Sequence, residues 1–154
     1  MARRIAVIGL GNPDRGDDAA GILVVRSLME RPRAGVEFLE DGEPFSILGR
    51  WDDFEAMILV DAVRSGSPAG TVQVFDGRAL PPSVRVGVFS THGFGIHELI
   101  GVGAALHTLP RVVRVVGIEA ADFTPGAPPT PEVERAVAEA VEIVVEEIER
   151  IPLS

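Results

Sequence analysis

The 154-residue chain contains no cysteine, no lysine and no tyrosine, and its only side-chain amides are Asn12 and Gln73. The absence of cysteine excludes disulfides, thiolate metal sites and a cysteine nucleophile. A metal site in this protein must therefore use His, Asp and Glu, which suit cations such as nickel, zinc or manganese. All fourteen Lys+Arg residues are arginine, and the net charge is −9. This charge argues against a nucleic-acid partner, because such binding needs clustered cations.

Long apolar runs are also missing, and none approaches the length of a membrane span. The first residues show no signal-peptide pattern. We therefore expect a cytoplasmic protein with no membrane partner. The length and the hydrophobic fraction of 46% predict one globular domain over residues 1–154.

The most informative stretch is a Gly-rich turn between an apolar strand at 5–8 and a helix that begins near Asp17. Asp14 stands where a dinucleotide-binding motif needs its third glycine, and Asp17 and Asp18 stand where a P-loop needs lysine and Ser or Thr. Two roles are open for the adjacent aspartates. Both can serve the N-terminus of the helix, or one can cap it while the other holds a metal or a cationic group. Asn12, the sole asparagine, serves either the turn or binding.

Strand and helix patterns alternate along the whole chain. We expect strands at 5–8, 35–39, 56–60, 71–75, 84–89 and 112–118, and helices at 17–30, at 45–51, from about 96 to 109, and after Thr130. The pattern predicts an α/β fold, a three-layer αβα sandwich on a mostly parallel central sheet. The short connection before residues 71–75 indicates a mixed sheet with an antiparallel edge strand.

Several acidic residues and one histidine follow predicted strands. They are Asp17, Asp18, Glu40, Asp41, Asp61 and His92. Because ligands collect at the carboxyl edge of such sheets, these residues are candidates for one site. Two aspartates of this set and His92, with a fourth position open, would suit a divalent metal, although Asp61 also fits an ordinary strand-end turn.

The other two histidines have simpler interpretations. His97-Glu98 resembles the start of a zinc-protease motif, but Gly101 replaces its second histidine. His107 is expected in the last turn of a helix, where a partly cationic side chain complements the dipole.

Four segments, in order along the chain, resemble the nickel–iron hydrogenase maturation endopeptidases. They are Gly9-Leu-Gly-Asn-Pro-Asp-Arg-Gly-Asp-Asp-Ala-Ala-Gly21, Val60-Asp61-Ala62, Ser90-Thr-His-Gly93, and Gly117-Ile118 with the later Thr130-Pro131-Glu-Val133. The resemblance implies an aspartyl endopeptidase, a hydrolase whose catalytic and metal-binding residues are Asp18, Asp61 and His92. Ala19-Ala20 departs from the glycine and aliphatic residue of many members, which leaves open which hydrogenase is served.

The resemblance also implies the substrate and the metal. The partner would be a hydrogenase large-subunit precursor, whose C-terminal extension is removed after nickel insertion. Nickel would be supplied by the substrate, and no organic cofactor is expected. The resemblance leaves the oligomeric state and the attacking nucleophile open.

Three alternatives remain at this point. A non-proteolytic nickel-handling accessory protein would need the same three ligands. A peptidyl-tRNA hydrolase also opens with a Gly-Leu-Gly-Asn-Pro-like turn, but the lack of tyrosine and the charge of −9 disfavour a polyanionic substrate. A divergent family member would act on another precursor.

Overall fold

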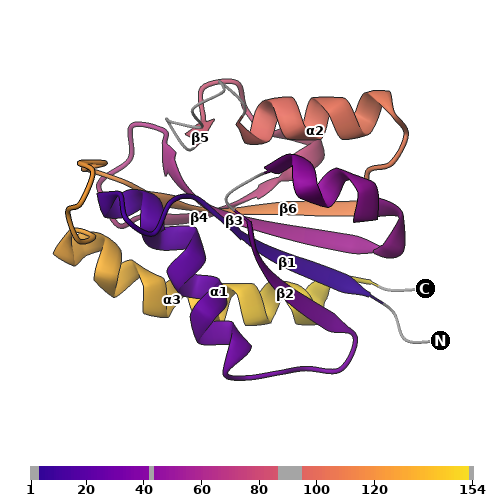
Figure 1. The fold of residues 1–154 in the computed structure, drawn as a ribbon, viewed down its shortest axis with the longest axis horizontal. Helices are drawn as coiled ribbons and strands as arrows, with labels where there is room; N and C mark the ends of the chain where they lie inside the picture. Colours follow the sequence, from indigo (N-terminus) through magenta and orange to yellow (C-terminus); the bar gives the residue numbers. More distant parts are fainter. Residues whose placement is uncertain (1–3, 42–43, 87–94, 153–154) are drawn as a thin grey trace.

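The computed structural model of the chain describes residues 4–41, 44–86 and 95–152 (Figure 1). Six strands form one sheet in this part: β1 (Ile5–Leu10), β2 (Val36–Asp41), β3 (Ala56–Arg64), β4 (Val72–Asp76), β5 (Arg85–Val86) and β6 (Val112–Glu119). The α-helices are α1 (Ala20–Met29), α2 (Ile96–Ala105) and α3 (Pro131–Arg150). Three 3-10 segments complete the order: η1 (Gly16–Ala19), η2 (Pro44–Asp53) and η3 (Gly77–Ala79).

The sheet is mixed, as the sequence predicts. Its strand order is β2-β1-β3-β6-β4, with β5 beside the end of β3. β2, β1, β3 and β6 are parallel, whereas β4 and β5 pair antiparallel with β6 and β3. β4 is thus the expected antiparallel edge strand.

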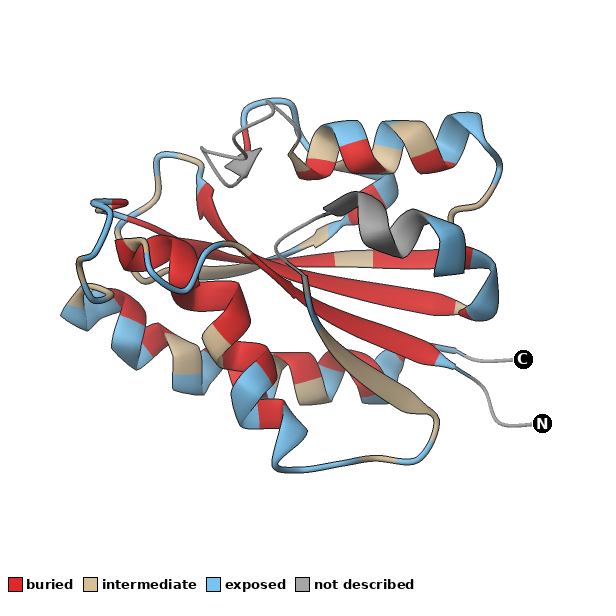
Figure 2. Ribbon diagram, viewed as in Figure 1, coloured by how far each residue is buried: buried red, intermediate tan, exposed pale blue. Residues whose placement is uncertain are grey.

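Helical segments cover both faces of the sheet (Figure 1). α1 and α3 pack on one face, where they share a buried cluster with alternate residues of β1, β3 and β6. α2 and η2 lie on the other face, over a second cluster around Trp51 and Phe54. The inner strands are buried on both sides (Figure 2), which explains their continuous apolar runs. The predicted three-layer αβα sandwich is confirmed.

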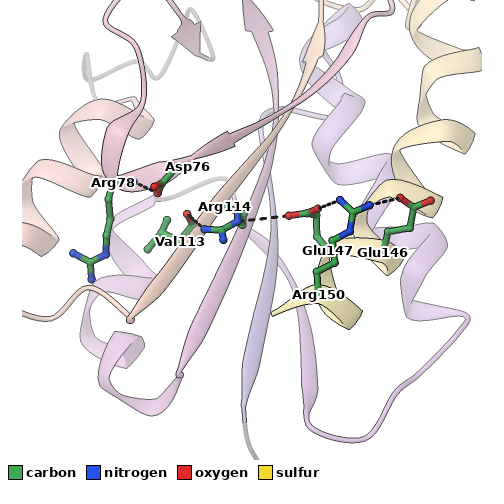
Figure 3. Close-up of polar contacts among 7 residues, drawn as sticks. All are labelled: Asp76, Arg78, Val113, Arg114, Glu146, Glu147 and Arg150. Carbon is green, nitrogen blue, oxygen red and sulfur yellow. Dashed lines mark hydrogen bonds and ion pairs between the residues drawn. The ribbon is translucent and has the colours of Figure 1, made fainter. Parts of the chain in front are cut away.

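α3 carries the clearest helical stripe, and its inner positions Val133, Ala140 and Val144 are fully buried. Near its end Glu147 is also buried, and two arginines compensate its charge (Figure 3). Arg114 Nε of β6 lies 3.6 Å and Arg150 Nη1 3.4 Å from Glu147 carboxylate oxygens. A buried charge requires such partners. This ion-pair cluster connects the last turns of α3 to the sheet near the start of β6.

His107 lies just beyond α2 rather than in its last turn, which corrects the expected position. It has a φ of 57°, and the Thr108 N–H donates to the Gly103 carbonyl at 2.9 Å. The His107 N–H donates to the Ala104 carbonyl at 3.2 Å. These two bonds form a Schellman motif with a histidine at the position where glycine is usual. His107 therefore has a local structural role.

No helix in the described ranges is long and apolar enough to cross a membrane. That residues 1–154 form a single domain stays a prediction.

Candidate active site

The turn after β1 folds back onto Asp18. Gly11 has a φ of 119°, and a Cβ at this position would lie 2.0 Å from the Asp18 carbonyl oxygen. Only glycine is compatible with this conformation and this approach. The Asn12 N–H donates to Asp18 Oδ2 at 3.0 Å, and the Asn12 side chain accepts from the Asp14 N–H at 2.9 Å. The side chain of the sole asparagine thus stabilises the turn, and its backbone N–H holds the Asp18 carboxylate.

The Asp18 carboxylate is incompletely satisfied. The residue is 5% exposed, and its Oδ1 is buried without a hydrogen-bond partner among the described residues. Burial raises the pKa of Asp18, and the Asn12 N–H and the nearby Arg15 charge offset this only in part. A buried carboxylate oxygen without a partner carries a free-energy cost that a proton or a cation would remove.

Asp61 is the second buried carboxylate of the site. The expectation that its strand ends there is wrong: β3 continues to Arg64, because pairing with β6 extends to Val63. Asp61 is 4% exposed, and its Oδ1 accepts from the Ala62 N–H at 2.8 Å. Burial raises its pKa well above the usual range, and the negative charge of Asp18 raises it further. Two buried like charges act on each other here, as they do where a proton or a cation is shared.

The structure does not bring every candidate into this pair. Glu40 is an exposed residue of β2, and both of its carboxylate oxygens pair with Arg26, at 2.9 and 3.0 Å. Asp41 ends β2, so both acids lie within the strand rather than after it. His92 lies outside the described residues. Within the described ranges no group of three or more His, Asp or Glu could hold a metal ion.

Asp17 does not cap the helical segment that follows the turn. Its carboxylate is fully buried and bonds to another part of the chain. It accepts hydrogen bonds from the loop between β6 and α3, including the Thr130 N–H at 2.7 Å. Thr130 occupies the N-cap position of α3, where its side chain makes no capping bond, and its hydroxyl donates to Asp17. The adjacent aspartates therefore differ: Asp17 is saturated by hydrogen bonds, whereas Asp18 keeps an oxygen that no described residue contacts by a hydrogen bond.

Comparison with known proteins decides the family. Residues 22–147 match the family described as hydrogenase maturation protease (HycI). The chain belongs to the hydrogenase maturation protease family. This family consists of peptidases, which confirms the enzyme class implied by the resemblance.

Curated relatives agree with this assignment. The chain is 27% identical to the hydrogenase 2 maturation protease of Escherichia coli (strain K12), over 92% of this chain and 88% of that protein. It is 30% identical to a putative hydrogenase maturation protease of Methanocaldococcus jannaschii, over 95% of this chain and 97% of that protein. It spans 66% of the hydrogenase expression/formation protein HupD of Thiocapsa roseopersicina, at 23% identity over 92% of this chain.

Solved structures share the fold. The HycI protease of Thermococcus kodakarensis KOD1 superposes with a TM-score of 0.76 at 25% identity, covering 96% of this chain and 93% of that chain. The HybD protease of Thermococcus kodakarensis gives 0.73 at 27% identity, covering 94% and 98%. The three-layer arrangement is thus the fold of the family.

Proposed function

We propose that this protein is an endopeptidase that removes the C-terminal extension of a nickel–iron hydrogenase large-subunit precursor after nickel has been inserted. One observation carries the proposal. In the part of the chain that the structure describes, Asp18 keeps a buried oxygen without a hydrogen-bond partner beside the buried Asp61, and both carboxylates have raised pKa values. Such a pair is unfavourable alone and favourable around a cation.

Asp18, Asp61 and His92 are the proposed ligands of the substrate's nickel and the proposed catalytic residues. With the site empty, the two carboxylates repel each other or hold a proton, so a precursor without nickel gains little from docking. A precursor that carries nickel neutralises both charges and gains binding free energy. A cation held there would also polarise the scissile carbonyl or lower the pKa of a bound water. Nickel would therefore act as a checkpoint for cleavage.

The rest of the proposal concerns partner and location. The protease names of the relatives, such as hydrogenase 2 maturation protease, support a hydrogenase precursor as substrate. We propose a cytoplasmic site of action, nickel that arrives with the substrate, and no organic cofactor. The family match and the relatives named as maturation proteases disfavour the nickel-handling accessory protein and the peptidyl-tRNA hydrolase, since both alternatives lack peptidase activity.

The test is incubation of the purified protein with a large-subunit precursor, loaded with nickel in one sample and nickel-free in the other, followed by mass spectrometry. We expect loss of a C-terminal peptide from the loaded precursor alone. Cleavage of both samples would contradict the nickel checkpoint. Tight binding of the loaded precursor without a mass change would contradict the protease and favour the accessory protein.

A further inference from the structure

Asp17 makes the densest set of hydrogen bonds around the site. Its Oδ2 accepts from the Ala121 and Asp122 N–H groups at 2.8 and 3.0 Å. Its Oδ1 accepts from the Thr130 N–H at 2.7 Å and from the Thr130 hydroxyl at 2.9 Å. The residue is 0% exposed. This carboxylate thus connects η1 to both ends of the loop between β6 and α3.

Backbone bonds reinforce the same contact. The Asp17 N–H donates to the Asp122 carbonyl at 2.8 Å, and the Gly16 N–H donates to the Ala127 carbonyl at 2.9 Å. The Gly126 N–H donates back to the Asp14 carbonyl at 2.7 Å. A Cβ on Gly16 would lie 2.5 Å from the Asp122 carbonyl oxygen, so the two segments are in close contact. In Figure 1 the loop after β6 lies beside the turn after β1, at one end of the sheet.

Asp18, the next residue, needs this support. Its carboxylate is buried near Asp61, so desolvation and like-charge repulsion both favour its movement toward water. The Asn12 N–H donates a hydrogen bond to one of its two oxygens, and the other finds no partner within residues 4–41, 44–86 and 95–152. η1 is only four residues long, and a 3-10 segment of this length has little stability of its own. The neighbouring hydrogen bonds of Asp17 oppose that movement.

We propose that Asp17 is a positioning residue, which holds Asp18 in the site by fastening η1 to the loop between β6 and α3 through Thr130. This inference rests on the proposed function, because it assigns Asp18 to recognition of the substrate. Asp17 itself does not touch the substrate. It acts through the placement of the adjacent carboxylate.

The test compares Asp17→Asn with Asp14→Asn, which removes the same charge from an exposed position of the same turn. In Asp17→Asn an amide NH₂ replaces one acceptor and meets backbone N–H donors, so bonds on one side are lost. Steady-state cleavage of the nickel-loaded precursor gives kcat and KM, and circular dichroism gives the folded fraction. We expect KM to rise about tenfold in Asp17→Asn, since displaced binding groups cost one to two orders of magnitude. Asp14→Asn should stay within about twofold of the wild type.

A purely structural role would give a different result. Loss of folded enzyme lowers kcat in proportion to the folded fraction and leaves KM unchanged. An unchanged KM in Asp17→Asn, with kcat lowered only in proportion to the folded fraction, would therefore overturn the inference. A wild-type protein that cleaves no precursor would overturn the proposed function, and the inference with it.

Variants of Thr130 cover the case in which Asp17→Asn does not fold. Thr130→Val removes the hydroxyl donor and keeps the backbone N–H, whereas Thr130→Ser keeps both. We expect KM to rise about threefold in Thr130→Val, the cost of one lost hydrogen bond, and to stay at the wild-type value in Thr130→Ser. Equal KM values in the two variants would overturn the inference.

Discussion

Replacement of Asp61 by asparagine is expected to slow cleavage of the nickel-loaded precursor strongly and to stabilise the folded protein at neutral pH. Loss of a charged group that is preorganised in a site lowers kcat by about 10²–10³-fold. The gain in stability also follows from removal of this negative charge. Asp61 is buried beside Asp18, and its ionised form is disfavoured in the fold. Asparagine keeps an oxygen that can accept from the Ala62 N–H and carries no charge.

The sign of the pH dependence follows from the raised pKa of Asp61. A carboxyl whose pKa is higher in the fold than in the unfolded chain binds protons more tightly in the fold. Its favourable contribution is complete below the unfolded pKa of about 3.9 and is lost as the pH rises through the folded pKa. Asp61→Asn does not lose that contribution. Its advantage over the wild type should therefore be small near pH 4 and largest above the folded pKa.

Urea unfolding of the wild type and Asp61→Asn from pH 4 to pH 8 measures this difference. A tenfold difference in proton affinity between the folded and the unfolded chain changes the free energy of unfolding by about 1.4 kcal/mol. Asp52→Asn is the matched control, because Asp52 is exposed and neutralisation there should change stability by less than about 0.5 kcal/mol. A variant that is less stable than the wild type at pH 8 would identify Asp61 as a structural residue.

Substitution of Gly21 by alanine should produce a large loss of stability. Gly21 lies at the start of α1, where the helix approaches β1 and β3 closely. A Cβ there would lie 2.1 Å from the Val60 carbonyl oxygen and 2.6 Å from that of Leu10. Neither oxygen can move without displacing a central strand, so the helix must shift away from the sheet. We expect a loss of about 3 kcal/mol or more, the upper range for overpacking.

Gly101→Ala is the control for this prediction. Gly101 is an exposed residue within α2, and a Cβ there would have no neighbour within 4 Å. Alanine should stabilise α2 by about 0.5–1 kcal/mol. Urea unfolding of both variants at the same pH measures the contrast. Similar free energies of unfolding for the two variants would contradict the close contact of α1 with the sheet.

The layers of the fold could be predicted from the sequence because each depends on a local pattern. The apolar runs of β1, β3 and β6 and the stripe of α3 are such patterns, and the structure has them where they were expected. The end of β3 could not be predicted in this way. A charged residue normally marks the end of a buried strand, but pairing with β6 carries β3 past Asp61.

The roles of the adjacent aspartates could be predicted only in part. The sequence indicates that one of the two is more than a cap requires. Which one is saturated depends on Thr130, which lies 113 residues further along the chain than Asp17. No local pattern carries that information. The third predicted ligand, His92, lies outside the described residues, and its place in the site stays a prediction.

The most direct test of the cation site is a crystal of the protein soaked in a nickel salt, with anomalous diffraction measured at the nickel absorption edge. We expect an anomalous peak about 2.0–2.2 Å from Asp18 Oδ1 and from an Asp61 carboxylate oxygen, the usual range for a divalent cation bound by carboxylates. The same soak of Asp61→Asn should show no peak at this position. An ordered nickel ion elsewhere on the protein, with Asp18 Oδ1 bonded only to water, would contradict the proposed site.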